Sequence, residues 1–98
     1  MDNVFCEERF LKEVKEIIKK FEPDATILLY GSRVNYTENN VHEGSDLDIS
    51  LKNCKNNISQ IRTAFSESNI PFLIDINVYK DMPISFQQEI DKNFVILV

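Results

Sequence analysis

Both glycines of this 98-residue chain, Gly31 and Gly44, lie at the two ends of one polar loop, and each adjoins a segment typical of a β-strand. Gly31 follows the apolar run Ala25–Tyr30, which is typical of a strand covered on both faces. Gly44 precedes the run Asp46–Ile49, in which acidic and apolar residues alternate. The sequence therefore predicts one strand before the loop and a second strand after it.

In the second strand, Asp46 and Asp48 point to the same face, because residues two apart in a strand share a face with their Cα atoms about 6–7 Å apart. Leu47 and Ile49 point to the other face and into the core. Two carboxylates that converge from one strand repel each other unless a cation lies between them, and Mg²⁺ prefers oxygen ligands of this kind. The pattern therefore favours a metal site on this strand.

A third carboxylate, Asp75, interrupts the apolar strand predicted over Phe72–Tyr79. A lone buried carboxylate is costly unless it is paired, protonated or bound to metal. If this strand lies beside that of Asp46 and Asp48, three carboxylates meet at one edge of the sheet, with Asn77 on the face of Asp75. Such a set suits phosphoryl chemistry assisted by two metal ions about 3.5–4 Å apart. The alternative for each carboxylate is a position at the end of a strand, where it is solvated or accepts hydrogen bonds from the backbone.

Gly31 and Ser32 are expected opposite these acids. A glycine after a strand lets backbone N–H groups approach a phosphate, and a helix that starts there adds a favourable dipole. Ser32 can donate its hydroxyl to the same oxygens, and Arg33 can supply positive charge; the alternatives are an ordinary turn and an arginine in solvent. Only the combination with the acids makes Gly31-Ser32 indicative of a nucleotide site.

The rest of the chain predicts an α/β (α+β) domain over residues 1–98, with a small mixed sheet flanked by helices. The apolar tail Phe94–Val98 is expected to be a last strand, a buried helix end or part of a partner interface. The predicted helices are Asn3–Phe21, Ser32–Glu38, Lys55–Ser68 and a last one that begins near Pro83; the predicted strands are Ala25–Tyr30, Leu47–Leu51 and Phe72–Tyr79.

Composition limits the classes of function. The net charge of −5 argues against sequence-independent nucleic-acid binding, so we expect no direct DNA binding. The N-terminus lacks a signal-peptide pattern and no run is long enough for a membrane span, so a cytoplasmic protein is expected. Cys6 and Cys54 are then expected as free thiols, and the single histidine, His42, as a surface residue.

These motifs together resemble the polymerase-β-type nucleotidyltransferase superfamily: Gly31-Ser32, a loop, Ser45-Asp46-Leu47-Asp48-Ile49 and then Asp75 in an apolar strand. The chain length, the leading helix and the ending resemble the minimal stand-alone members, known as MNT proteins, over residues 8–98. The resemblance implies a nucleotidyltransferase fold, two Mg²⁺ ions and a nucleoside triphosphate, with ATP expected.

The resemblance also implies roles for single residues. It implies that Asp46 and Asp48 bind both metal ions, and that Asp75 helps to activate the attacking hydroxyl. The candidates for nucleotide binding are Gly31, Ser32, Arg33 and Ser45, of which Gly31 and Ser32 would hold the β- and γ-phosphates. Minimal members are similar to antitoxins paired with an all-helical HEPN protein, in some cases adding AMP to one of its tyrosines, so a partner of that kind is implied.

Three hypotheses follow. The chain is an enzyme that transfers AMP from MgATP to a protein hydroxyl, or an interaction module that acts by stoichiometric binding, or a small α/β domain with a structural Mg²⁺ or no ligand. The apolar tail, the acidic surface and the lack of a basic residue over Val34–Tyr36 favour the second. The tail also suggests a homodimer or a hetero-oligomer.

Overall fold

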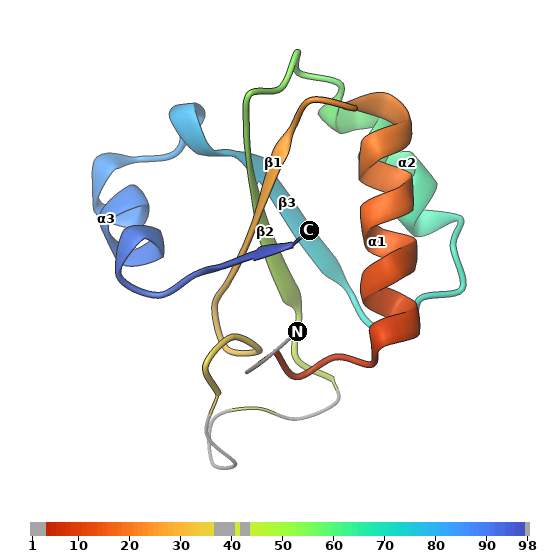
Figure 1. Cartoon of the computed structure of the whole chain (residues 1–98), viewed down its shortest axis with the longest axis horizontal. Helices are drawn as coiled ribbons and strands as arrows, with labels where there is room; N and C mark the ends of the chain where they lie inside the picture. Colours follow the sequence, from red (N-terminus) through yellow and green to blue (C-terminus); the bar gives the residue numbers. More distant parts are fainter. Residues whose placement is uncertain (1–3, 37–40, 42–43, 98) are drawn as a thin grey trace.

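The computed structural model describes residues 4–36, 41 and 44–97, and within them it contains three α-helices, one short 3₁₀ helix and a four-stranded sheet. Two helices cover one face of the sheet and the third lies on the opposite side (Figure 1). The elements in chain order are α1 (Glu8–Phe21), β1 (Thr26–Tyr30), β2 (Leu47–Lys52), α2 (Ile58–Ser66), β3 (Ile74–Val78), η1 (Tyr79–Asp81), α3 (Ile84–Lys92) and β4 (Val95–Leu97).

The sheet is mixed, and its strand order is β3-β2-β1-β4. Strand β1 is antiparallel to both β2 and β4, whereas β2 and β3 are parallel. The parallel pair is joined through α2, which crosses over the sheet as parallel connections require. Strand pairing therefore sets β2, which carries Asp48, between the two strands that hold Tyr30 and Asp75.

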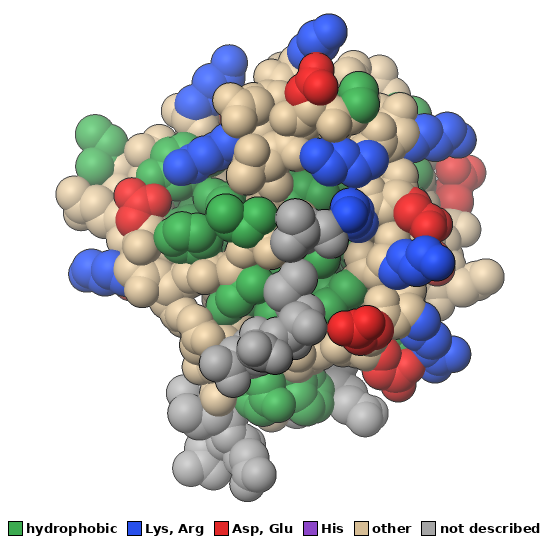
Figure 2. Space-filling model, in the orientation of Figure 1, with side chains coloured by type: hydrophobic (Ala, Val, Ile, Leu, Met, Phe, Trp, Pro, Cys, Tyr) green, Lys and Arg blue, Asp and Glu red, His purple; other side chains and the backbone are tan. Residues whose placement is uncertain are grey.

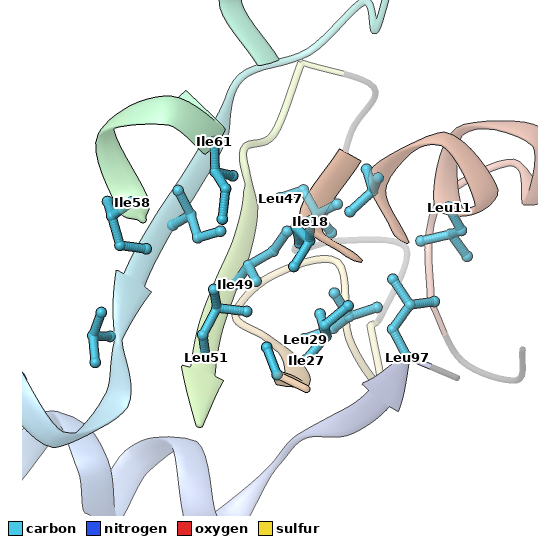
Figure 3. Packing of buried hydrophobic residues seen from close by; sticks show 14 of the residues in the cluster. Leu11, Ile18, Ile27, Leu29, Leu47, Ile49, Leu51, Ile58, Ile61 and Leu97 are labelled. Atoms are coloured by element: carbon cyan, nitrogen blue, oxygen red, sulfur yellow. The ribbon is translucent and has the colours of Figure 1, made fainter. Parts of the chain in front are cut away.

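The core lies between the sheet and the pair α1 and α2, where apolar side chains from both layers meet (Figure 3). Alternate residues of each strand face these helices, as the two-residue period of a strand requires. The labelled side chains that meet there are Leu11, Ile18, Ile27, Leu29, Leu47, Ile49, Leu51, Ile58, Ile61 and Leu97. On the opposite face Ser50 is also buried, and its hydroxyl contacts Met82 Sδ at 3.4 Å.

A buried carboxylate ties the end of α1 to the start of α2. Glu22 is 2% exposed, and its two oxygens accept hydrogen bonds from the backbone N–H groups of Lys55 at 2.8 Å and Asn57 at 2.7 Å. The Asn57 amide donates in turn to the Phe21 carbonyl at 3.0 Å. Burial alone would raise the pKa of Glu22, but these hydrogen bonds outweigh it and the pKa is lowered. Glu22 therefore supports the fold as a charged group.

The helix predicted from Asn3 begins instead at Glu8. Of the described residues before it, Val4 bridges Val34, and the Phe5 N–H donates to the Arg33 carbonyl at 2.7 Å. The short helix predicted over Ser32–Glu38 is wrong for its described part, which forms turns and the Val34 bridge, because these backbone groups pair with the N-terminal segment.

In the apolar tail, Val95–Leu97 form β4, the first of the three predicted alternatives. Cys6 and Cys54 are both free thiols, as predicted. The surface position expected for His42 falls outside the described residues. Within the described part of the chain, none of the helices has the length and apolar character needed to cross a membrane.

Candidate functional site

Three side chains form a row across the sheet on the face opposite α1 and α2. Tyr30 at the end of β1 pairs with Asp48 on β2, and Asp48 pairs with Asp75 on β3. Paired residues on neighbouring strands have Cα atoms roughly 4.5–5.5 Å apart and point to the same face. The row therefore brings a phenol and two carboxylates together, although they lie far apart in sequence.

Gly31 follows Tyr30 and makes room for the central carboxylate of the row. Its φ is 84°, in the region that favours glycine. A Cβ at this position would lie 2.0 Å from Asp48 Oδ2 and 2.9 Å from Asp48 Cγ. Only a residue without a side chain lets the Asp48 carboxylate occupy its position beside the backbone.

Asp48 carries charge that its surroundings do not balance. Burial, then the neighbouring charge of Asp75 and then that of Asp46, together raise the pKa of Asp48 from 3.8 to about 6. Like charges and partial burial both disfavour the ionised form of a carboxyl group. A perturbed carboxyl in a cleft is a common mark of a functional site, and a bound cation would relieve its repulsion.

Asn77 links the two ends of the row. Its side-chain N–H donates to Asp75 Oδ1 at 3.3 Å, and its side chain also hydrogen-bonds to the Tyr30 hydroxyl. Burial, Asp48 and Asp75 raise the pKa of Tyr30, whereas the hydrogen bond from Asn77 lowers it. Sequence reasoning treated Tyr30 only as a strand residue; its place directly before Gly31, on the strand face opposite Leu29, was the signal that could have found it.

The row opens into a cleft of about 840 Å³ that is walled by β3, α2, η1 and α3. Four carboxylates line it, from Asp48, Asp75, Asp81 and Glu89, and the apolar wall comes from Met82, Pro83, Phe86 and Ile90. Among the described residues, Arg62 is the one lysine or arginine in this lining, and its guanidinium donates to the Ile76 carbonyl at 2.9 Å. The cleft is therefore acidic, with an aromatic ring at its rim.

The other predicted site residues lie around this cleft rather than in it. Asp46 is exposed just before β2 and acts on Asp48 through its charge. Ser32 is exposed in the turn after Gly31, and the Ser45 carbonyl accepts a hydrogen bond from Arg33 Nε at 2.8 Å. The structure thus brings together Gly31, Asp48 and Asp75, and leaves both serines outside the cleft lining.

Arg33, expected as a phosphate contact or a solvent-exposed charge, is 3% exposed and lies in neither position. Its guanidinium donates to the backbone carbonyls of Phe5 and Ser45 and lies 4.2 Å from the centroid of the Phe72 ring. It lines a second hollow beside the N-terminal segment, so its charge supports packing there. In this structure Arg33 is not part of the acidic cleft.

The fit of Mg²⁺ to this site rests on the chemistry of its donors. In the part of the chain that the structure describes, no three His, Cys, Asp or Glu side chains lie close enough together to hold a metal ion. Asp48 and the exposed Asp75 lie side by side on neighbouring strands, and carboxylate oxygens are the ligands that suit a hard cation. The exposed side chain of Asp46 would have to turn toward them to complete a three-carboxylate set.

A scan against protein-family models matched no family, and a search of curated proteins gave no match.

Proposed function

We propose that this protein is a Mg²⁺-dependent nucleotidyltransferase that transfers AMP from ATP to a hydroxyl of a protein partner. The observation that carries the proposal is the Asp48–Asp75 pair, set side by side on β2 and β3 over Gly31. It opens into a cleft of about 840 Å³, a size typical of small-molecule sites. A cytoplasmic protein with the nucleotidyltransferase fold is the context we infer for it.

In this proposal, Asp48 and Asp75 hold Mg²⁺, and Asp46 joins them once its exposed side chain turns inward. Bound Mg²⁺ would neutralise the triphosphate and favour departure of pyrophosphate. Asp75 accepts the proton of the attacking hydroxyl, and the hydrogen bond from Asn77 orients that carboxylate. Gly31, which has no side chain, leaves the room beside the backbone that the Asp48 carboxylate occupies in this proposal.

The element order supports a nucleotidyltransferase fold. One acid lies on β2 and the next on the parallel strand β3, and α2 joins them, so the chain itself delivers both carboxylates to one face. The described turn at Ser32–Tyr36 departs from the expected helix, so the phosphate contacts we infer come from the Gly31 and Ser32 backbone and hydroxyl rather than from a helix start.

A second candidate is an interaction module that acts by stoichiometric binding to a partner, such as the small all-helical HEPN-like protein that the family resemblance implies. Figure 2 shows hydrophobic side chains grouped in the middle of one face of the molecule, with charged side chains around them. Four large apolar side chains of α3 and the segment after it are exposed, namely Ile84, Phe86, Phe94 and Ile96. Such a surface also suits a homodimer.

Label transfer separates the two candidates. The protein would be incubated with source-cell lysate and MgATP labelled either at the α- or at the γ-phosphate. The Asp46→Asn/Asp48→Asn variant would run beside it, with Asp24→Asn as the matched control, because Asp24 is an exposed aspartate in the turn after α1. We expect a protein to be labelled from the α-phosphate only, with labelling lost in the double variant and kept in the control.

Transfer from the γ-phosphate would contradict the proposal and indicate a kinase-like reaction. If neither label is transferred while a partner still copurifies with wild type and double variant alike, the interaction module replaces the enzyme as the function.

A further inference from the structure

We propose that the Tyr30 hydroxyl is itself an acceptor of the nucleotidyl group, so that the protein modifies its own cleft when no partner hydroxyl occupies it. This inference rests on the proposed nucleotidyl transfer and adds to it an acceptor that lies within the chain. It starts from the geometry of the row Tyr30–Asp48–Asp75, in which a phenol and two carboxylates share one face of the sheet.

Tyr30 is accessible from the cleft. It lines the cleft together with Gly31, Asp48 and Asp75, and it is only half-buried. A nucleotide that binds these groups would therefore lie against the phenol. No change of backbone is needed to bring the hydroxyl to the site, because strand pairing already holds it there.

The Tyr30 hydroxyl interacts with side chains of β3. Asn77 donates to Asp75 Oδ1 at 3.3 Å, and its hydrogen bond to the phenol lowers the pKa of Tyr30, so one amide interacts with both groups. A hydroxyl next to a carboxylate that can take its proton is the arrangement that general-base catalysis requires. In the proposed step, Asp75 takes the proton of Tyr30 as it would take that of an external acceptor.

The proposed step balances with a nucleoside triphosphate as the co-reactant. Tyr30 Oη attacks the α-phosphorus, and a phenolic O–P bond forms while the bond from the α-phosphorus to the α–β bridging oxygen breaks. The proton of the hydroxyl passes to the Asp75 carboxylate, and pyrophosphate leaves with the bridging electron pair. The product is a phosphodiester that joins Tyr30 to the nucleoside monophosphate.

The chain offers two matched tyrosines for comparison. Tyr36 is 41% exposed and packs edge-on against the Phe5 ring, with centroids 5.3 Å apart. Tyr79 donates its hydroxyl to both Asp91 oxygens, at 2.8 and 2.9 Å. Neither tyrosine lines the cleft, whereas Ser59 does and provides a competing hydroxyl. If Tyr30 alone is modified, the cause is therefore its position in the cleft and not a general reactivity of exposed tyrosines.

The first test uses the purified protein without lysate. Wild type and the variants Tyr30→Phe, Tyr36→Phe and Tyr79→Phe would be incubated with MgATP labelled at the α-phosphate, and the modified peptide mapped by mass spectrometry. We expect label on the Tyr30 peptide, at least tenfold less label in Tyr30→Phe, and unchanged label in the other two variants. Thermal melting shows whether Tyr30→Phe folds, and if it does not, the peptide map of the wild type decides.

The second test does not depend on turnover. Tetranitromethane nitrates accessible tyrosines, and its reaction at each tyrosine would be followed with and without Mg²⁺ and a non-hydrolysable ATP analogue. We expect the analogue to slow nitration of Tyr30 several-fold and to leave Tyr36 unchanged. Nitration of Tyr30 that proceeds equally with and without the analogue would overturn the inference.

The possible results distinguish failure of this inference from failure of the proposed function. If α-label reaches a lysate protein but the self-label maps to Ser59 or to no residue, Tyr30 is not an acceptor and the proposed function stands. If no label moves to any protein and the analogue does not bind, the proposed function fails together with the inference.

Discussion

At the scale of single residues, the acidic site restricts position 31 to glycine. Two independent conditions exclude a side chain there. The backbone lies at φ 84°, and a Cβ would approach Asp48 Oδ2 to 2.0 Å. The first condition is local, whereas the second depends on a residue from the neighbouring strand. The two can be separated experimentally.

Gly31→Ala is expected to destabilise the protein by more than about 1 kcal/mol, because strained backbone and contact with Asp48 add together. In an Asp48→Ala background the contact is gone, so the same change should cost less and only the backbone strain should remain. Urea unfolding of both single variants and the double variant measures the coupling. Additive effects would mean that Asp48 does not lie over Gly31.

Glu22→Gln is expected to cost about 1.5–3 kcal/mol, because an amide cannot accept from both backbone N–H groups that the carboxylate satisfies. The pKa of Glu22 is lowered from 4.5 in the folded protein, so the stabilisation is present above that value and is lost as pH falls through the folded pKa. Urea midpoints at pH 7 and pH 3 test this, with the exposed Glu16→Gln as control. A loss that does not shrink at pH 3 would contradict the explanation.

At the scale of elements, the sequence predicts which segments fold locally but not how the strands pair. The spacing of Leu11, Val14 and Ile18 identifies α1, and the alternation after Gly44 identifies β2. Helix ends were predicted too long, because the caps depend on distant groups such as the Glu22 carboxylate. The order β3-β2-β1-β4 depends on pairing between segments far apart in sequence, which no local period encodes.

Strand β4 gives a prediction at this scale. Leu97 faces the core and is 6% exposed, whereas Ile96 points to the other face and is 46% exposed. Leu97→Ala should therefore cost about 2–5 kcal/mol, and Ile96→Ala no more than about 0.5 kcal/mol. Urea unfolding of both variants provides the measurement. Similar large costs for both would mean that another surface covers Ile96, as in a dimer.

At the scale of the whole molecule, whose net charge is −5, several acidic side chains line the same cleft. The Asp48–Asp75 pairing could be expected from the alternating acids and the interrupted apolar strand, once those strands were taken as neighbours. The contributions of Arg62 and α3 could not be foreseen, because they follow from the strand order and from the position of α3 against the sheet. The buried position of Arg33 likewise depends on Phe5, 28 residues away along the chain.

The repulsion at this cleft predicts how stability depends on pH. Asp48 has a folded pKa of about 6 against a usual 3.8, so the folded state keeps a proton that the unfolded state has lost between these values. Stability therefore falls as pH rises through this window, and the penalty is complete above it. Asp48→Asn should stabilise the protein at pH 8 by about 1–2 kcal/mol after discounting for solvent screening, and should have little effect below pH 4. Urea unfolding at both pH values, with Asp24→Asn as control, tests this; no gain at pH 8 would contradict the raised pKa.

The same repulsion predicts a response to Mg²⁺ that involves no catalysis. A cation that binds only the folded protein stabilises it by about 2.7 kcal/mol at one hundred times its dissociation constant. Because Asp48 must be ionised to bind, millimolar Mg²⁺ should raise the melting temperature of the wild type clearly at pH 8 and much less at pH 5. Asp48→Asn and Asp75→Asn should lose most of this response, while Asp24→Asn keeps it. Scanning calorimetry at both pH values measures the shift. An equal shift in all variants would mean that Mg²⁺ binds elsewhere, and the carboxylate pair would then act without a metal ion.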